Sequence, residues 1–206
     1  MTPNITDITV PARACLDHGL DGVSAINTVA CIMSVDLDSL RPVPTVEGRS
    51  TPGGYSGRAV KPMALAKVAA LAGMISKNEE YVKRGVSLSG IGGVETGGDA
   101  AEFLLLGAGT VQVCTGVMLH GYPLVQRLCG GLQRFMEAKG FESIEEFRGL
   151  ALPYVTTHSD LVQRQRGGKE KVVVAAKAPA VGLASDAEWT GDNFVADADS
   201  MVANNK

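Results

Sequence analysis

The sequence predicts an α/β fold, the C-terminal half of a (β/α)8 TIM barrel followed by a C-terminal extension. Short apolar runs alternate with helical stretches and are joined by glycine-rich turns, as in parallel βαβ units. The 206 residues include 25 glycines and only 5% aromatics, a balance that suits many tight strand-to-helix turns. Three such strands are evident in residues 1–149, whereas a complete eight-stranded barrel needs roughly 250 residues.

The first unit combines a helix, a strand and a long loop. Residues 8–18 carry apolar side chains at helical spacing and end at Gly19, a usual C-terminal cap. Residues 22–26 read as a short strand buried on both faces. A proline- and glycine-rich loop follows, and Pro62 stands in the first turn of a helix that runs to about Met74.

The same pattern then recurs twice. Residues 86–89 predict a strand, residues 90–93 a glycine turn, and residues 98–106 a helix. A further strand at residues 110–114 precedes a single long helix over residues 117–139.

The C-terminal part is less regular. Residues 143–146 fit a capping box for one more short helix, and the periodicity ends near Leu150. We therefore divide the chain into a partial barrel domain, residues 1–149, and an extension, residues 150–206. The extension is expected either to dock through Trp189 and Phe194 or to stay partly irregular.

Composition and charge exclude several functional classes. The 19 basic and 22 acidic residues, with a pI near 5.6, imply no nucleic-acid-binding face. The most apolar stretch, residues 103–117, is interrupted by Gly107 and Gly109 and predicts no membrane span, and the N-terminal residues show no signal pattern. Cysteines and histidines lack metal-ligand spacing, so no metal site is expected. These residues are Cys15, Cys31, Cys114, Cys129, His18, His120 and His158.

Glycine turns after consecutive strands are the most informative feature. Residues 90–93 and 114–116 follow the last two strands, where parallel barrels commonly bind phosphate through backbone amides. Thr115 could add a hydroxyl donor, and residues 53–57 could supply a third arc of amides. The alternative is that these glycines only make tight turns. If they form a cup, Gly92→Glu should abolish phosphate binding and leave the fold intact.

Two further positions carry candidate chemistry. Asn27 and Thr28 follow the first strand, where barrel enzymes place substrate contacts, and a carboxamide can pair with the amide edge of a planar heterocycle. The alternative is that Asn27 only caps the loop. Cys114 invites assignment as a nucleophile, but a cysteine at the end of an apolar strand is more often an inert buried thiol.

Five ordered motifs resemble one family. They resemble the second half of the pyrimidine-reducing domain of the dihydropyrimidine dehydrogenase family, within the wider dihydroorotate dehydrogenase-like group. The C-terminal residues, including 189–192, are similar to the plastid-targeted plant and green-algal form. The motifs lie at residues 2–7, 25–29, 53–62, 90–93 and 112–116.

The resemblance implies an FMN enzyme that reduces the 5,6-double bond of uracil or thymine with electrons from NADPH. It places Asn27 and Thr28 on pyrimidine contacts. It places flavin-phosphate contacts at Gly57, Gly92, Gly93, Cys114 and Thr115. It identifies no catalytic residue here, because the family's flavin-contacting lysine and acid cysteine loop match no residue of this sequence.

The resemblance also implies partners and a location. We expect a homo-oligomer or a missing N-terminal half-barrel, a plastid location (otherwise the cytoplasm), and no activity of these 206 residues alone. Two alternatives stay open. One is a non-catalytic half-barrel that binds phosphate or flavin, or assembles with another chain. The other is a different phosphate-binding barrel enzyme.

Overall fold

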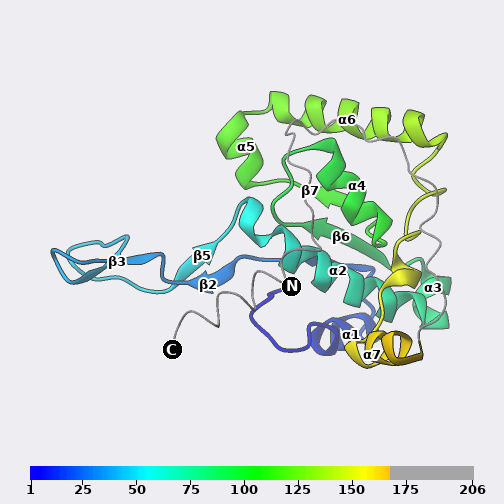
Figure 1. Cartoon of the computed structure of the whole chain (residues 1–206), viewed down its shortest axis with the longest axis horizontal. Helices are drawn as coiled ribbons and strands as arrows, with labels where there is room; N and C mark the ends of the chain where they lie inside the picture. The colour runs from blue at the N-terminus through cyan, green and yellow to red at the C-terminus, as the bar shows by residue number, and fades with distance from the viewer. Residues whose placement is uncertain (168–206) are drawn as a thin grey trace. The chain divides into compact units, whose positions relative to one another are not determined.

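The computed structural model describes residues 1–167 (Figure 1). The chain divides into two compact units, Met1–Asp160 and Leu161–Lys206, and the first contains every site discussed below. The expected docking of Trp189 and Phe194 lies outside the described residues.

A parallel sheet organises the first unit. Within residues 1–167, β1 (Gly22–Ala25), β6 (Ser87–Ile91) and β7 (Thr110–Gln112) pair in the order β1-β6-β7. All pairs are parallel, with Ala25 opposite Gly90 and Gly90 opposite Val111. The three predicted strands and their parallel arrangement are therefore confirmed, and the fold is α/β.

Helices α2 (Lys61–Ser76) and α4 (Gly97–Leu105) pack on one face of this sheet. Their Val68, Leu71 and Phe103 side chains are fully buried. Among the described residues, the segment 58–76, which joins η1 (Arg58–Val60) to α2, is apolar and long enough to cross a membrane. About 39% of this segment is buried, including the α2 residues that face the sheet.

The remaining described helices are short or lie outside this sheet layer, and α7 belongs mostly to the second unit. They are α1 (Thr9–Asp17), α3 (Glu79–Arg84), α5 (Thr115–His120), α6 (Pro123–Lys139), the short η2 (Leu152–Tyr154) and α7 (His158–Gly167). The predictions for α1, α2 and α4 are confirmed to within about two residues, the usual uncertainty of helix ends.

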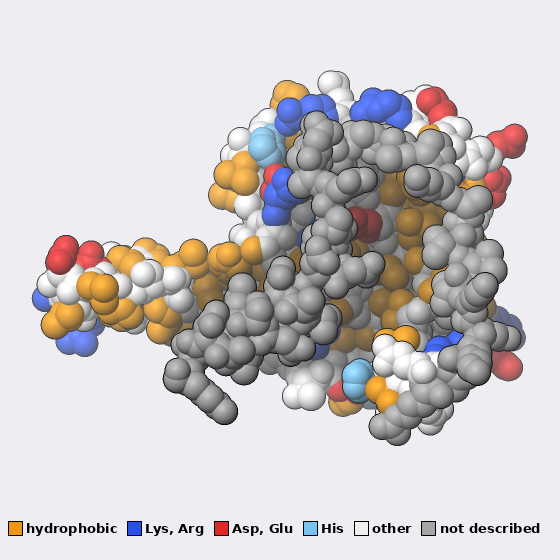
Figure 2. All heavy atoms as spheres, viewed as in Figure 1, with side chains coloured by type: hydrophobic (Ala, Val, Ile, Leu, Met, Phe, Trp, Pro, Cys, Tyr) orange, Lys and Arg blue, Asp and Glu red, His pale blue; other side chains and the backbone are white. Residues whose placement is uncertain are grey.

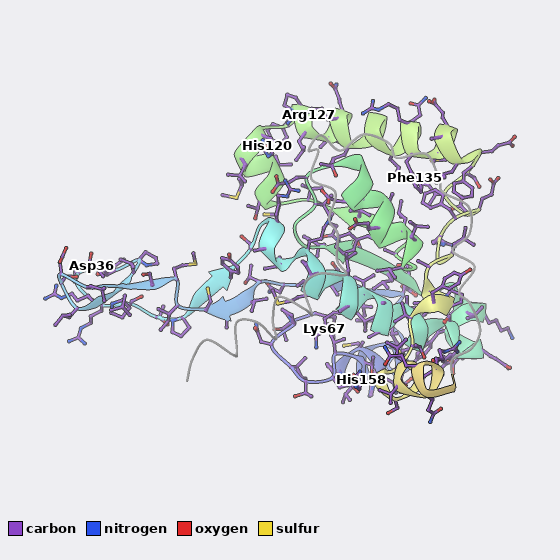
Figure 3. All side chains as sticks on the ribbon, viewed as in Figure 1. Asp36, Lys67, His120, Arg127, Phe135 and His158 are labelled. Atoms are coloured by element: carbon purple, nitrogen blue, oxygen red, sulfur yellow. The ribbon has the colours of Figure 1, made fainter. Side chains whose placement is uncertain are left out.

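The predicted single helix over residues 117–139 is wrong. Gly121 has φ +71° and ψ 176°, a conformation that leaves the helix, and α6 restarts at Pro123. The short helix predicted at residues 143–146 is also wrong, because these residues form turns. Those turns pack on α6 through three aromatic rings, one of which is labelled in Figure 3. The rings are Phe135, Phe141 and Phe147, with centroids 5.2–6.2 Å apart.

The predicted loop after β1 contains a two-stranded arm, residues 29–55. β2 (Val29–Cys31) pairs with β5 (Gly53–Tyr55), and β3 (Ser34–Asp36) pairs with β4 (Arg41–Val43), both antiparallel. The arm projects from the body, with Asp36 near its far end and hydrophobic side chains along its surface (Figures 1, 2 and 3). Three-residue strands interrupted by prolines give no periodicity, which explains why they were not predicted.

The two faces of the parallel sheet differ in polarity. Val23 and Leu88 are buried under the helices. On the opposite face, Gln112 Nε2 donates to Ser24 Oγ (3.0 Å) and Ser89 Oγ (2.7 Å). The prediction that residues 22–26 are buried on both faces is therefore wrong, since burial alternates along β1.

Candidate ligand-binding site

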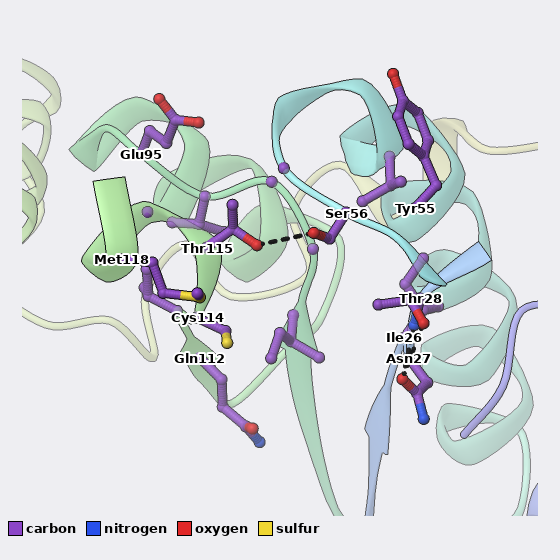
Figure 4. A pocket seen from close by; sticks show the side chains of 18 residues that line it. Ile26, Asn27, Thr28, Tyr55, Ser56, Glu95, Gln112, Cys114, Thr115 and Met118 are labelled. Carbon is purple, nitrogen blue, oxygen red and sulfur yellow. Dashed lines mark hydrogen bonds between the residues drawn. The ribbon is translucent and has the colours of Figure 1, made fainter. Parts of the chain in front are cut away.

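A cavity of about 270 Å³ lies at the C-terminal ends of the three parallel strands. Four segments that are distant in sequence line it, one after each strand and one where the arm returns to the body (Figure 4). They are residues 26–28, 55–57, 91–95 and 112–116. The structure thus brings every predicted site residue to one cavity.

The three glycine-containing turns, at residues 55–57, 92–93 and 114–116, form one side of this cavity, which we call the glycine cup. Gly57 has φ +79° and ψ −165°, a region that only glycine adopts readily. A Cβ on Gly93, whose φ is +74°, would lie 2.8 Å from the carbonyl oxygen of Gly57. These glycines are needed because the first two turns pack backbone against backbone.

A side chain at position 92 would point away from the cup. Its φ is +138°, and an added Cβ would lie 2.8 Å from Ala64 Cβ and 3.4 Å from Ile26 Cγ1. Because both neighbours are buried, a side chain at this position enters the core beneath the cavity. This packing argues against the expectation that Gly92→Glu leaves the fold intact.

The third turn is joined to the first by a side-chain hydrogen bond. Thr115 Oγ1 donates to Ser56 Oγ at 3.0 Å, the contact dashed in Figure 4. Ser56 was not singled out in the sequence. Cys114 also lines the cavity and is exposed, so the prediction of a buried thiol is wrong. It is accessible because it follows the last strand at the open end of the sheet.

Asn27 and Thr28 line the same cavity on the side of β1. Asn27 Oδ1 accepts a hydrogen bond from the backbone N–H of Thr28 at 2.7 Å, so the local cap is present. The backbone N–H of Asn27 donates to the carbonyl of Met1 at 2.8 Å. Asn27 Nδ2 donates to no residue in the described part of the chain, which leaves the donor half of the carboxamide available.

A partly buried ion pair lies behind the cup. Lys61 Nζ contacts Asp99 Oδ1 at 2.5 Å and Glu102 Oε2 at 2.9 Å. Burial alone would lower the pKa of Lys61, but its hydrogen bonds to both carboxylates outweigh burial and raise that pKa. Burial would likewise raise the pKa of Asp99, but hydrogen bonds from Lys61 and from the backbone of Glu95 and Thr96 lower it.

The sequence contained a weak signal for part of this arrangement. Thr96 and Asp99 form a capping box at the start of α4, with Thr96 Oγ1 accepting from Asp99 N at 3.1 Å. The partner Lys61 lies 38 residues earlier in the chain, and no local pattern connects the two positions.

The available donors fit an anionic group. The backbone N–H groups of Gly57 and Gly93 donate to no carbonyl within residues 1–167, and the hydroxyls of Ser56 and Thr115 lie at the same rim. Backbone amides and hydroxyls of this kind commonly bind phosphate. In contrast, the described residues contain no group of three or more histidine, cysteine or acidic side chains that could hold a metal ion.

Comparison with known proteins identifies relatives over most of the chain. A family model for dihydroorotate dehydrogenase matches residues 1–136. The chain is 58% identical over 204 residues to the chloroplastic dihydropyrimidine dehydrogenase (NADP+) of Arabidopsis thaliana, covering 99% of this chain and 46% of that protein. It is 45% identical over 161 residues to the NAD-dependent dihydropyrimidine dehydrogenase subunit PreA of Escherichia coli, covering 78% and 38% respectively.

A more distant relative is the catalytic subunit of dihydroorotate dehydrogenase B (NAD+) from Pyrococcus abyssi. Identity is 40% over 152 residues, covering 74% of this chain and 46% of that protein. The chain therefore spans less than half the length of each of these relatives.

Proposed function

The chain belongs to the dihydroorotate dehydrogenase family, and from this premise we propose that it forms the FMN-phosphate and pyrimidine-contacting part of an oxidoreductase. The proposed enzyme reduces the 5,6-double bond of uracil or thymine with electrons from NADPH. One observation carries the proposal. The three turns of the glycine cup line one cavity together with Asn27 and Thr28, although Gly57 and Thr115 are far apart in the sequence.

We assign roles from this geometry. Backbone amides at Gly57, Gly92 and Gly93 and the segment Cys114–Thr115 contact the flavin phosphate, and Ser56 supports Thr115 through its hydroxyl. The free Nδ2 of Asn27 donates to a carbonyl of the pyrimidine, while Thr28 holds the Asn27 carboxamide in place. FMN, when bound, supplies the hydride chemistry. The described residues bind and orient both groups.

The open sheet supports a half-barrel. Among the described strands, β1 and β7 each have one unpaired edge, and the described helices α2 and α4 pack on the face opposite the polar one. Unpaired edges favour association with further strands. We propose that the remaining barrel strands pair with these edges and come from the same polypeptide or from another chain. We also propose that the assembly is oligomeric and lies in the plastid, since the name of the Arabidopsis relative describes it as chloroplastic.

Flavin titration tests the function. The fluorescence of FMN should be quenched when it binds. FMN should bind at least about tenfold more tightly than riboflavin, which lacks only the phosphate. Excess inorganic phosphate should weaken FMN binding. Equal affinity for the two flavins would contradict the phosphate cup.

Pyrimidine binding is a separate test. In the assembled enzyme, Asn27→Ala should weaken uracil binding by about tenfold or more, because a buried carbonyl loses its donor at a cost of about 1–3 kcal/mol. An unchanged uracil affinity would leave Asn27 as a loop cap only. A phosphate-binding barrel enzyme of another class would bind FMN or another phosphate without responding to uracil.

A non-catalytic assembly module is the second candidate, and the open sheet edges favour it. Size-exclusion chromatography with light scattering, followed by an NADPH oxidation assay, distinguishes such a module from part of an enzyme. A module should purify as a stable complex with flavin but should not oxidise NADPH when uracil is added, even after its missing strands are supplied.

A further inference from the structure

The ion pair behind the glycine cup connects two of its turns. Lys61 begins α2, four residues after Gly57, and its ammonium reaches Asp99 in the first turn of α4. The side chains of Lys61 and Asp99 are 22% and 5% exposed. Neither residue lines the cavity, so the pair does not touch the proposed ligand.

Asp99 divides its two oxygens between two parts of the cup. Oδ1 accepts from Lys61, and Oδ2 accepts from the backbone N–H groups of Glu95 (3.0 Å) and Thr96 (2.8 Å). Oδ2 also accepts from the Thr96 hydroxyl at 2.8 Å. Residues 95–96 lie two and three residues after Gly93. One carboxylate therefore ties the Gly93 turn to the ammonium that follows the Gly57 turn.

The lysine stem makes a second connection. An added Cβ on Gly93 would lie 2.9 Å from Lys61 Cβ and 3.1 Å from Arg58 Cα. The two turns thus approach each other at Lys61 without space for an additional atom. On the other side of the cup, the Ser56–Thr115 hydrogen bond joins the third turn to the first.

We propose that Lys61 and Asp99 are a positioning pair that fixes the spacing of the Gly57 and Gly93 turns for the phosphate of the flavin. This inference rests on the proposed function only for the identity of the ligand. Loss of the Lys61 charge leaves the largely buried Asp99 carboxylate without its cation. Loss of the Asp99 charge leaves Lys61 with only its more exposed partner, Glu102 at 2.9 Å, and weakens the acceptor for the amides of residues 95–96. The two turns then separate, and the amides on them no longer converge on one anion. Because the pair lies at the phosphate end, binding of the flavin ring should change little.

A matched set of variants tests the pair in the 206-residue chain. Lys61→Met removes the charge and keeps most of the stem, Lys61→Arg keeps the charge, and Asp99→Asn keeps the shape of the carboxylate. Lys67→Met is the control, because Lys67 also lies on α2 but donates to the carbonyls of Ile5 (2.9 Å) and Thr6 (3.3 Å), away from the cup (Figure 3). Circular dichroism first verifies that each variant is folded.

The first readout is affinity for FMN and riboflavin. Lys61→Met and Asp99→Asn should weaken FMN by about tenfold or more and riboflavin by less than about twofold, because charge-assisted contacts to phosphate depend on fixed donors. Lys61→Arg should retain most of the FMN affinity, and Lys67→Met should change neither affinity. An equal loss for both flavins, or no loss, would overturn the proposal.

The second readout needs no ligand. Hydrogen exchange of the amides of Glu95 and Thr96 should accelerate in Lys61→Met and Asp99→Asn, whereas the amides of α3 should keep their rates. Unchanged exchange at residues 95–96 would overturn the pair. If wild-type protein binds the two flavins equally, the proposed function fails, but the exchange rates still decide the role of the pair. Should Lys61→Met not fold, Asp99→Asn provides both readouts.

Discussion

The two faces of the parallel sheet are built for different neighbours, although the same three strands supply both. On the helix-covered face, an added Cβ on Gly90 would lie 2.5 Å from Phe103 Cδ1, so α4 packs directly onto the backbone of β6. On the open face, Ser24, Ser89 and Gln112 form a hydrogen-bonded polar row. We therefore expect the covered face to determine the stability of the fold, whereas the open face offers hydrogen-bonding groups to polar partners.

Removing the largest contact on the covered face should have the largest effect. Phe103 is fully buried and packs against Gly90. Phe103→Ala should lower the free energy of unfolding by about 4 kcal/mol, the sum of lost burial and a new cavity. Urea unfolding measures it. Tyr122→Ala, at an 84% exposed position, is the control and should change stability by less than about 0.5 kcal/mol. Similar losses in both variants would contradict the comparison.

Acid should weaken the covered side through Asp99. The pKa of Asp99 is below its ordinary value of 3.8, so its contribution is complete above that value and is lost as the pH falls through the folded-state pKa. Lys61 has a raised pKa, so its contribution is lost only in strong alkali, above its ordinary 10.5. Between about pH 5 and 9 the pair should therefore be unaffected.

The Asp99→Asn variant isolates this contribution. It should lower the free energy of unfolding at pH 7 by about 2–3 kcal/mol, because Asp99 loses its charge-assisted hydrogen bonds while Lys61 keeps only its more exposed partner Glu102. It should also flatten the fall in stability as the pH drops below 3.8, when unfolding is followed by circular dichroism. Asp38→Asn, on the exposed arm, is the matched control. A wild-type acid slope that persists in Asp99→Asn would assign the acid response to other carboxylates.

Gly92 lies where the cup meets the core. Gly92→Ala should cost about 2 kcal/mol, because the methyl group overlaps Ala64 and the positive φ is strained for an L-residue. Gly53→Ala is the control, since an added Cβ there meets nothing within 4 Å. Thermal unfolding of the two variants should differ by several degrees. If Gly92→Ala were neutral, the turn would have to be able to move away from α2.

The sequence predicted the features that depend on local periodicity. The strands, α2 and α4 repeat apolar residues at strand or helix spacing, and the glycine turns follow the strand ends. Features that depend on distant partners could not be predicted. The pair of Lys61 and Asp99 is formed across 38 residues, and the exposure of Cys114 depends on which sheet face stays open.

Two local predictions failed because of single residues or short elements. Gly121 interrupts the apolar pattern of residues 117–139 without changing its period, so a single helix seemed continuous. The arm has strands of three residues, which are too short to show alternation. The sequence likewise cannot show at which of these glycines an added side chain would enter the cup, because this depends on φ and on the packing of α2 below Gly92.

The smallest expected effect concerns the open face, where Gln112→Leu removes the donor to Ser24 and Ser89. In the chain alone, water can replace this donor because Gln112 is exposed, so the cost should be at most about 1 kcal/mol. Gln133→Leu is the matched control, because it removes an exposed hydrogen bond to Glu137 on α6. Urea unfolding of the two variants should show nearly equal losses in the free energy of unfolding.

In an assembled barrel the same row of polar groups is enclosed, and a lost donor leaves buried hydroxyls unsatisfied, which costs about 1–3 kcal/mol. The difference between Gln112→Leu and Gln133→Leu should therefore appear only when the remaining strands are present. A cost for Gln112→Leu that is already large in the 206-residue chain would show that its open face is covered there.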